Sequence, residues 1–567
     1  MATADPISTS RQSGPPSPRS APSPSESSAS PWAPLRLRTF RILWLAQLGS
    51  NVGSWMQTVA TQWLLVDRHA TLVALVQTAS LLPVVFLSLP AGVLADTLDR
   101  RKLLVWSTAA MTLFAAVLAG STAAGYHGPA LLLLITFLLG CGSALTAPAW
   151  QAIQPDLVPR SEIANAAALG SITVNGARAV GPALAGFLVA WVGAAPVFAL
   201  NAISFVGILV ALLMWQQPRR AGSLDSERMV EALRTGLRYL RAAPGVRRVI
   251  ERSVLFAGPA SALWALLPIV SHDHYHLSAS GYGLMLGALG VGAIVGVWRL
   301  GWLRSRVSPN LVLAGSAVAF AFATVSAAVL PLALTTAALV AGGAAWVATL
   351  STLNAAMQIS LPGWVRARGL AAYILAFMGA QAVGAFAWGL LATHLGLDET
   401  LVVSAVSLGL VALSVLVLPL HQKTLELDRA TSVPWPVPSV VLDPSPTDGP
   451  VEVNVTYEVE PELVDEFLGT MAEVEKSRRR TGAQRWRVQR DGGERTRFRE
   501  SFIVPSWGEH LRQHRDRITG TDADILASAR ALATQVPEVR HFFPATTAAL
   551  SDLIDVVGTE RDGGDEA

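Results

Sequence analysis

The sequence predicts an all-α membrane protein of twelve transmembrane helices in two six-helix halves, followed by a small α+β domain. Three observations support this prediction: a charge-poor first part with recurring apolar stretches, basic residues confined to alternate loops, and a charge-rich end. Residues 1–420 carry 25 basic and 14 acidic residues, whereas residues 421–567 carry 18 and 26. A soluble surface is normally about a quarter to a third charged, and charges are costly in a bilayer. The composition therefore excludes a single soluble enzyme and indicates an integral membrane protein with a soluble appendage.

Apolar stretches of about 20 residues, each long enough to cross about 30 Å of hydrocarbon, recur from Thr39 onward. Basic residues lie in alternate loops, and the opposite loops contain only Arg68. By the positive-inside rule both termini are cytoplasmic, which requires an even number of spans. We expect a multi-pass protein of the cell (inner) membrane with spans at 39–66, 71–95, 103–124, 130–153, 164–190, 194–215, 253–271, 281–303, 310–330, 333–358, 368–393 and 400–420.

The chain divides into seven segments by composition. The first is rich in Pro and Ser and cannot bury enough apolar surface to offset its ordering entropy. The linker between the halves carries an Arg-rich amphipathic pattern over 229–252, which is typical of a helix on an anionic leaflet or of a solvated connector. The expected segments are a disordered cytoplasmic tail (1–34), the N-terminal half (35–215), a cytoplasmic linker with an amphipathic helix (216–252), the C-terminal half (253–422), a Pro-rich linker (423–447), the α+β domain (448–545) and an acidic tail (546–567).

The two halves echo each other in sequence. Gly92 precedes Arg100 by eight residues after the second span, and Gly296 precedes Arg304 by eight residues after the eighth. Repeated halves in a polytopic membrane protein point to a secondary transporter with its substrate site between the halves.

The loop after the second span reads Gly92-Val-Leu-Ala-Asp96-Thr-Leu-Asp99-Arg100-Arg101-Lys102. It resembles the signature loop between spans two and three of the major facilitator superfamily, which implies a gating motif of Gly92, Asp96, Asp99, Arg100 and Arg101. Small Gly92 lets helices approach closely, and Asp96 at a helix end can pair with a helix dipole or an Arg. The family pattern has Gly where Asp99 stands.

The fifth span carries Asn175-Gly-Ala-Arg178-Ala-Val-Gly181-Pro182-Ala-Leu-Ala-Gly186. This stretch resembles the Gly-Pro motif of the superfamily's exporters, with Arg178, Gly181, Pro182 and Gly186 at its centre. Pro182 removes a helix hydrogen bond, and the glycines allow close packing. A guanidinium inside a span needs a partner or a water-filled cavity, so Arg178 could bind an anionic or polar substrate or the carbonyls freed near Pro182.

Four longer stretches are similar to the transmembrane secretion effector branch of the superfamily, namely 96–102, 154–166, 263–268 and 346–358. That branch includes enterobactin-type siderophore exporters and some macrolide efflux proteins, and the resemblance covers about 38–422. It implies export of an amphipathic organic compound (a siderophore, a secondary metabolite or a drug) by alternating access with proton coupling. The superfamily's usual Arg in span four is absent from this sequence.

No Asp or Glu lies centrally in a predicted span, so proton coupling rests on the resemblance, and Asp67 at the end of span one is the candidate. Amides inside a span are costly unless they are paired or face water, which suggests a central cavity. Interhelical hydrogen bonds explain them equally well. The expected cavity residues are Asn51, Trp55, Gln62, Asn175, Arg178, Asn354, Gln358 and Gln381.

The soluble end has the order βαββαβ and resembles a ferredoxin-like domain of the dimeric α+β barrel type. His510 and His514, four residues apart, are its ligand candidates. We expect a small organic substrate, membrane lipids and a homodimer through this domain as partners, and no nucleic acid, metal, cofactor or enzymatic activity. The alternative is a membrane-tethered sensor or enzyme whose activity lies in the C-terminal domain.

Overall fold

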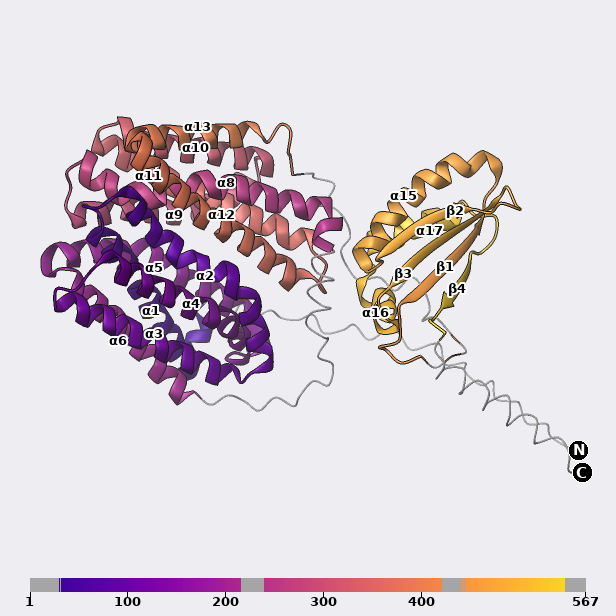
Figure 1. The fold of residues 1–567 in the computed structure, drawn as a ribbon, viewed down its shortest axis with the longest axis horizontal. Coiled ribbons are helices and arrows are strands. Elements are labelled where there is room, and N and C mark those ends of the chain that lie inside the picture. Colours follow the sequence, from indigo (N-terminus) through magenta and orange to yellow (C-terminus); the bar gives the residue numbers. More distant parts are fainter. Residues whose placement is uncertain are drawn as a thin grey trace, which may run out of the picture.

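The computed structural model describes residues 30, 32–215, 239–420, 440, 442 and 444–545. Residues 1–29 of the predicted tail at 1–34, the predicted tail at 546–567, the first part of the central linker and most of the Pro-rich linker therefore lie outside the described residues. The described chain forms a helical bundle and a separate sheet domain (Figure 1). The predicted fold class is confirmed.

The N-terminal half contains six long helices, each of which overlaps one predicted span. They are α1 (Arg38–Leu64), α2 (Ala70–Thr97), α3 (Arg100–Ala123), α4 (Pro129–Ile153), α5 (Ile163–Val192) and α6 (Ala194–Met214). The C-terminal half repeats this number with α8 (Pro244–Ile269), α9 (Ala279–Arg304), α10 (Pro309–Val329), α11 (Leu332–Ser360), α12 (Arg366–Leu395) and α13 (Leu397–Leu413).

Ten of these described helices are long and apolar enough by themselves to cross a bilayer, and α1 and α13 are the exceptions. Helix α13 has 17 residues, and α1 carries the amides of Gln47, Asn51, Gln57 and Gln62 within its apolar run. Helix α8 begins at Pro244, nine residues before the predicted span, because the backbone is extended at the N-cap Ala243 and proline favours the first helical position. Residues 244–252 therefore belong to α8 and not to the linker.

The helix contacts repeat between the halves. Within the first half α2 packs on α4, α3 on α4 and α6, and α1 on α5; within the second, α9 packs on α11, α10 on α11 and α13, and α8 on α12. The halves meet through two equivalent pairs, α2 with α12 and α5 with α9. The repeat predicted from sequence is thus a repeat of packing.

We call one end of the bundle the basic end, because the connections there carry most of the bundle's Arg and Lys. Helices α2, α4, α6 and α9 finish at this end, and α1, α3, α5, α10 and α12 begin there. Its basic residues include Arg100, Arg101, Lys102, Arg304, Arg306, Arg366 and Arg368.

The sheet domain comprises β1 (Val451–Glu458), α15 (Val464–Thr481), β2 (Arg485–Arg490), β3 (Arg497–Val504), α16 (Trp507–Arg512), α17 (Gly520–Ala531) and β4 (Glu538–Phe542). Its strands pair antiparallel in the order β2-β3-β1-β4. Alternate residues of β1 are buried, and they share one core with the apolar residues of α15 and α17. Because both helices cover this face, the other face of the sheet is left without a helix.

Candidate substrate cavity

A cavity of about 730 Å³ lies within the N-terminal half, near the basic end. Residues of α1, α3, α4, α5 and α6 line it together with Gln154 and Leu157, and all of the helical ones except Ser54 lie at the midpoint of their helix or nearer the basic end. Among the residues that the structure describes, the cavity lining contains no Asp, Glu, Lys or Arg. Its walls therefore suit a ligand whose bulk is uncharged.

Amides and aromatic rings lie among the aliphatic and hydroxyl side chains of the cavity wall. Gln47 donates a hydrogen bond to Asn51 over 3.1 Å, and Asn175 donates to the Ser171 carbonyl over 3.0 Å. Each amide has further donor and acceptor positions, so the wall can both pack against an apolar body and hydrogen-bond to it. The amide residues are Gln47, Asn51, Gln151, Gln154 and Asn175, and the aromatic ones are Phe40, Trp44, Trp150 and Phe205.

Two of the eight cavity residues expected from sequence, Asn51 and Asn175, line this cavity. Asn354 and Gln358 are exposed on α11 and are hydrogen-bonded to each other over 2.9 Å, and Gln381 is buried on α12. The remaining three, Trp55, Gln62 and Arg178, lie deeper on α1 and α5. The sequence prediction missed Gln47, Gln151 and Gln154, although Gln47 stands one helical turn before Asn51.

Away from the basic end, hydrogen bonds join the two halves directly. The Tyr282 hydroxyl of α9 donates to Gln62 over 2.8 Å, and the Thr78 hydroxyl of α2 donates to the Ala382 carbonyl over 2.9 Å. Thr71 and Thr393 are 2.8 Å apart through their hydroxyls. These contacts close the end of the bundle opposite the cavity.

The Gly-Pro stretch of α5 makes one of the close approaches between the halves. A Cβ atom on Gly186 would lie 2.5 Å from the Ala279 carbonyl oxygen and 2.8 Å from the Gly283 Cα atom. Within the first half, a Cβ on Gly181 would lie 2.7 Å from the Trp55 Cβ. Only glycine fits at these two positions, because the opposing atoms belong to backbone or to a packed ring.

Comparison with known protein families assigns this chain to one of them. The sequence matches the transmembrane secretion effector family of the major facilitator superfamily over residues 29–548. The chain belongs to this family. Since the matched range extends beyond the bundle, it includes the sheet domain as well.

Curated relatives of this transmembrane secretion effector are bacterial transporters. The chain is 25% identical to the staphyloferrin A transporter of Staphylococcus aureus over 43% of its own length and 62% of the relative's. It is 26% identical to the multidrug efflux pump Tap of Mycobacterium tuberculosis over 51% of this chain and 71% of that one. It is 28% identical to the enterobactin exporter EntS of Escherichia coli over 39% of this chain and 53% of that one. The matches to the first and third relatives thus span less than two thirds of those proteins.

Solved structures support the transporter fold. An inward-facing, occupied bacterial homologue of the lysosomal transporter Spinster superposes with a TM-score of 0.56 at 15% identity, covering 69% of this chain and 98% of that one. The nucleoside transporter NupG (D323A mutant) superposes with a TM-score of 0.55 at 13% identity, covering 67% and 99%. The helical bundle therefore shares the fold of these two proteins.

The stretch predicted to be a gating motif anchors α3 within the first half. Arg100 donates hydrogen bonds to the Ala95 and Ala152 carbonyls, and Arg101 donates to the Leu212 and Leu213 carbonyls at the end of α6. Cations are stabilised at such a helix end by the free carbonyls and the dipole. The motif's basic residues thus tie α3 to α4 and α6.

The structure gives Asp99 and Gly92 of the motif other surroundings than the sequence predicts. Asp99 is the N-cap of α3 and accepts a hydrogen bond from the Lys102 amide over 3.0 Å, which gives the departure from the family's Gly a physical role. A Cβ on Gly92 would meet nothing within 4 Å, so the close helix approach expected there does not occur in this conformation. The side chain of Asp96, near the end of α2, lies outside the described residues.

Asp67, the proton-coupling candidate, lies just beyond α1 at the end opposite the cavity. Its carboxylate is 3.2 Å from the Nε2 atom of His272, which follows α8 in the second half. His272 also contacts Asp273, through Nδ1 at 2.6 Å. The two halves therefore meet there through a titratable pair, of which sequence reasoning identified only the acid.

The histidine candidates of the sheet domain are buried and form a cluster with a third histidine. The rings of His510 and His514 lie 4.7 Å apart, although α16 ends at Arg512 and His514 belongs to the following π-turn. The Nε2 atoms of His510 and His541 are 2.9 Å apart. Among the described residues no group of three or more His, Cys, Asp and Glu has the arrangement of a metal site.

Burial sets the charge state of this cluster. Burial and the neighbouring His514 and His541 lower the pKa of His510 to about 2. Burial and the positive charge of Arg478 lower the pKa of His514 to about 4. Both imidazoles are therefore neutral at physiological pH. His541 lies on the half-exposed edge strand β4, and no sequence pattern predicted that it would join the other two histidines.

Proposed function

We propose that this protein is a secondary active exporter that moves an amphipathic organic compound out of the cell by alternating access. The cavity near the basic end carries this proposal. By the positive-inside rule the basic end and both termini lie in the cytoplasm, so the cavity would take up its ligand from the cytoplasm. The contacts at Gln62, Thr71 and Thr78 would then form the closed outer gate.

The cavity also bears on the class of compound. A volume of about 730 Å³ accommodates a drug-sized molecule, and an uncharged wall of amides and aromatic rings favours a large uncharged body. The named relatives are a staphyloferrin A transporter, a multidrug efflux pump and an enterobactin exporter. A siderophore, secondary metabolite or drug of amphipathic character is accordingly the proposed substrate.

Blocking the cavity tests this function. Ala167 lines the cavity, whereas the adjacent exposed Ala168 does not. Ala167→Trp should reduce efflux of the fluorescent dyes Hoechst 33342 and ethidium at least tenfold, since the indole occupies ligand volume. Efflux is measured as ATP-energised dye uptake into everted membrane vesicles.

The control is Ala168→Trp, which faces away from the cavity and should transport like the unchanged protein. Equal dye transport by the Ala167→Trp and Ala168→Trp variants would show that the substrate does not pass through this cavity. Dye accumulation in the opposite direction, into right-side-out vesicles, would overturn the proposed direction.

Proton coupling through Asp67 forms part of the same proposal. The Asp67 side chain is 78% exposed at the proposed outer gate and is paired with His272, so its carboxylate can exchange a proton with the external solvent. If it couples transport, Asp67→Asn should transport without responding to collapse of the pH gradient by nigericin. Asp273→Asn, at the neighbouring acid, is the matched control and should keep that response.

We further propose that the sheet domain pairs with a second copy through its uncovered face. That face carries both signs of charge, including Glu452, Arg487, Arg499 and Glu538, so a two-fold partner can match unlike charges. A monomer by light scattering of the full chain in detergent at micromolar concentration would contradict this pairing.

A further inference from the structure

A second, much smaller cavity lies between the two halves, one helical turn beyond the substrate cavity. Arg178 and Pro182 of α5 line it from the first half, and Trp264 of α8 and Trp346 of α11 line it from the second. Its volume is about 10 Å³, which is room for about one oxygen atom. The rest of its wall is Leu286, Leu289, Gly290, Ala293 and Gly343.

Three hydrogen-bond donors around this space have no acceptor. They are the Nε atom of Arg178 and the Nε1 atoms of Trp264 and Trp346, all buried and all unpartnered among the described residues. Trp264 and Trp346 are 9% and 3% exposed, so bulk water does not reach them. Buried donors are nearly always paired in folded proteins, and three unpaired ones beside one cavity indicate a site that awaits an acceptor.

The charge of Arg178 strengthens the same conclusion. None of the ion pairs in the described part of the chain involves this guanidinium. The positive charge of Arg178 is instead stabilised by a cation–π contact with Trp55, whose ring centroid lies 5.5 Å from the guanidinium carbon. An aromatic face is a weak substitute for a carboxylate, so the site favours a ligand that brings negative charge.

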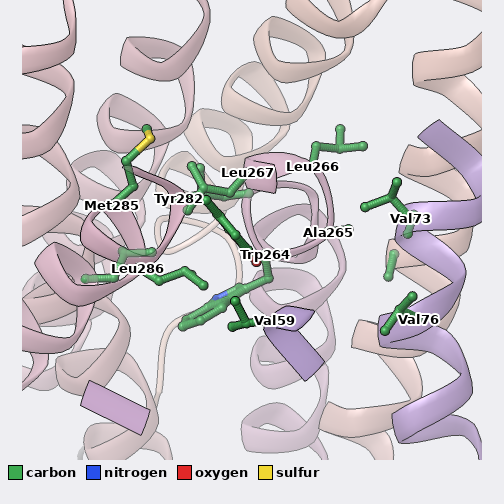
Figure 2. Packing of buried hydrophobic residues seen from close by; sticks show 14 of the residues in the cluster. Val59, Val73, Val76, Trp264, Ala265, Leu266, Leu267, Tyr282, Met285 and Leu286 are labelled. Atoms are coloured by element: carbon green, nitrogen blue, oxygen red, sulfur yellow. The ribbon is translucent and has the colours of Figure 1, made fainter. Parts of the chain in front are cut away.

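The small cavity is placed to receive one end of a molecule held in the larger one. The wall of the substrate cavity ends at Ser54 on α1 and at Asn175 on α5. Trp55 follows Ser54 directly, and Arg178 stands about 4.5 Å further along α5 than Asn175. Figure 2 shows Trp264 between Val59 of α1 and Leu286 of α9, within the packed core where the halves meet.

We propose that Arg178, Trp264 and Trp346 form a subsite for a single anionic oxygen of the transported compound, carried by a carboxylate or a phenolate. The body of the compound occupies the uncharged cavity, and its acidic end reaches the guanidinium. Because the donors come from both halves, the bound oxygen links them and favours the closed outer gate. This inference rests on the proposed export function and adds a substrate class: amphipathic organic acids.

Binding of matched acids and amides tests the subsite. The full chain is reconstituted in lipid nanodiscs, and binding of benzoate, 2-naphthoate and 1-pyrenebutyrate is compared with that of their primary amides by isothermal titration calorimetry. The unchanged protein should bind at least one acid tenfold or more tightly than its amide. Arg178→Gln should abolish that preference, and Trp346→Phe should weaken acid binding about five- to twentyfold while keeping the ring.

Trp298→Phe is the control for loss of an indole, because Trp298 is 87% exposed on α9. It should bind like the unchanged protein. Size-exclusion profiles report whether Arg178→Gln folds, and Trp346→Phe carries the test if it does not. Equal affinity for acids and amides in the unchanged protein, or an acid preference that survives Trp346→Phe and Arg178→Gln, would overturn the subsite.

The outcome is independent of transport. An acid preference that depends on Arg178, together with absence of ATP-energised uptake of both the dyes and 1-pyrenebutyrate into everted vesicles, would leave the subsite standing and refute export. Dye efflux without any acid preference would refute the subsite and leave export standing.

Discussion

The bundle and the sheet domain differ in how they pair their buried charges. In the sheet domain Glu500 is fully buried and accepts hydrogen bonds from Arg478 at 2.9 Å, Trp486 at 3.0 Å and Tyr457 at 3.1 Å. In the bundle Arg178 and two indoles find no acceptor. A satisfied network specifies one rigid arrangement, whereas unsatisfied donors between two halves leave room for a ligand and for a second conformation.

The same contrast extends to packing. The sheet domain buries Glu509 against Arg517 at 2.6 Å and Asp522 against Arg480 at 2.7 Å. The bundle instead relies on glycine contacts and single hydrogen bonds between its halves. Contacts of that kind can be broken and reformed at modest cost, as a transport cycle requires.

The largest effect is expected from breaking the satisfied network. Glu500→Gln removes the charge that Arg478 needs and leaves a buried guanidinium, which typically costs about 3–5 kcal/mol. The unfolding transition of the sheet domain, followed by hydrogen exchange of β1 and β3 in the full chain, should move by this amount. Glu538→Gln, in the exposed pair with Arg540, should change it by less than about 1 kcal/mol.

Acid should destabilise the sheet domain through its histidines. His510 and His514 have folded-state pKa values of about 2 and 4, below the value of about 6.5 in an unfolded chain. Between these values the unfolded state binds more protons, so stability is fully present above pH 6.5 and is lost as the pH falls. Two such groups give about 2–3 kcal/mol of loss per pH unit below 6.5.

The measurement is the denaturant midpoint of the sheet domain, by hydrogen exchange of the full chain, between pH 7.5 and 5. The double variant His510→Asn, His514→Asn should flatten the profile. An equal slope in the double variant would assign the acid sensitivity to other groups.

A smaller effect on stability and transport is expected from filling the contact between Gly186 and α9. Gly186→Ala places a methyl group against the backbone of α9, and overpacking of this kind costs about 1–3 kcal/mol. Because the contact closes the outer gate, dye efflux should fall several-fold while expression is retained. Gly176→Ala on the same helix, where a Cβ meets nothing within 4 Å, should transport normally.

The smallest effect concerns the N-cap of α3. Asp99→Ala removes the acceptor of the Lys102 amide and should cost about 1 kcal/mol, while Asp99→Asn should restore most of it. Thermal unfolding in detergent distinguishes this from a gating role, which would lower transport at unchanged stability in both variants.

Much of the architecture was predictable from sequence. Apolar length, Arg and Lys positions and two motif stretches predicted twelve spans in two halves, and alternation in Val451–Glu458 predicted the first strand. The site was less predictable, because periodicity identifies polar residues within a span but not which neighbour they face. Gln62 was expected to line the cavity and instead bonds to Tyr282, a partner 220 residues away.

Two further differences have the same origin. Trp264 and Trp346 resemble ordinary core aromatics in sequence, and only three-dimensional packing brings their N–H groups to Arg178. His541 joins His510 through pairing of β1 with β4, which no local pattern encodes.

The unpaired guanidinium of Arg178 also has an electrical consequence. A carrier with one uncompensated charge near the middle of the membrane responds to membrane potential, by about 2.3 kcal/mol per elementary charge per 100 mV when the charge crosses the whole field. An interior-negative potential therefore favours the empty carrier in whichever conformation holds Arg178 closer to the cytoplasm. A bound carboxylate cancels that charge, so the loaded carrier reorients without sensing the voltage, and the resting potential of the cell acts on only one half of the cycle.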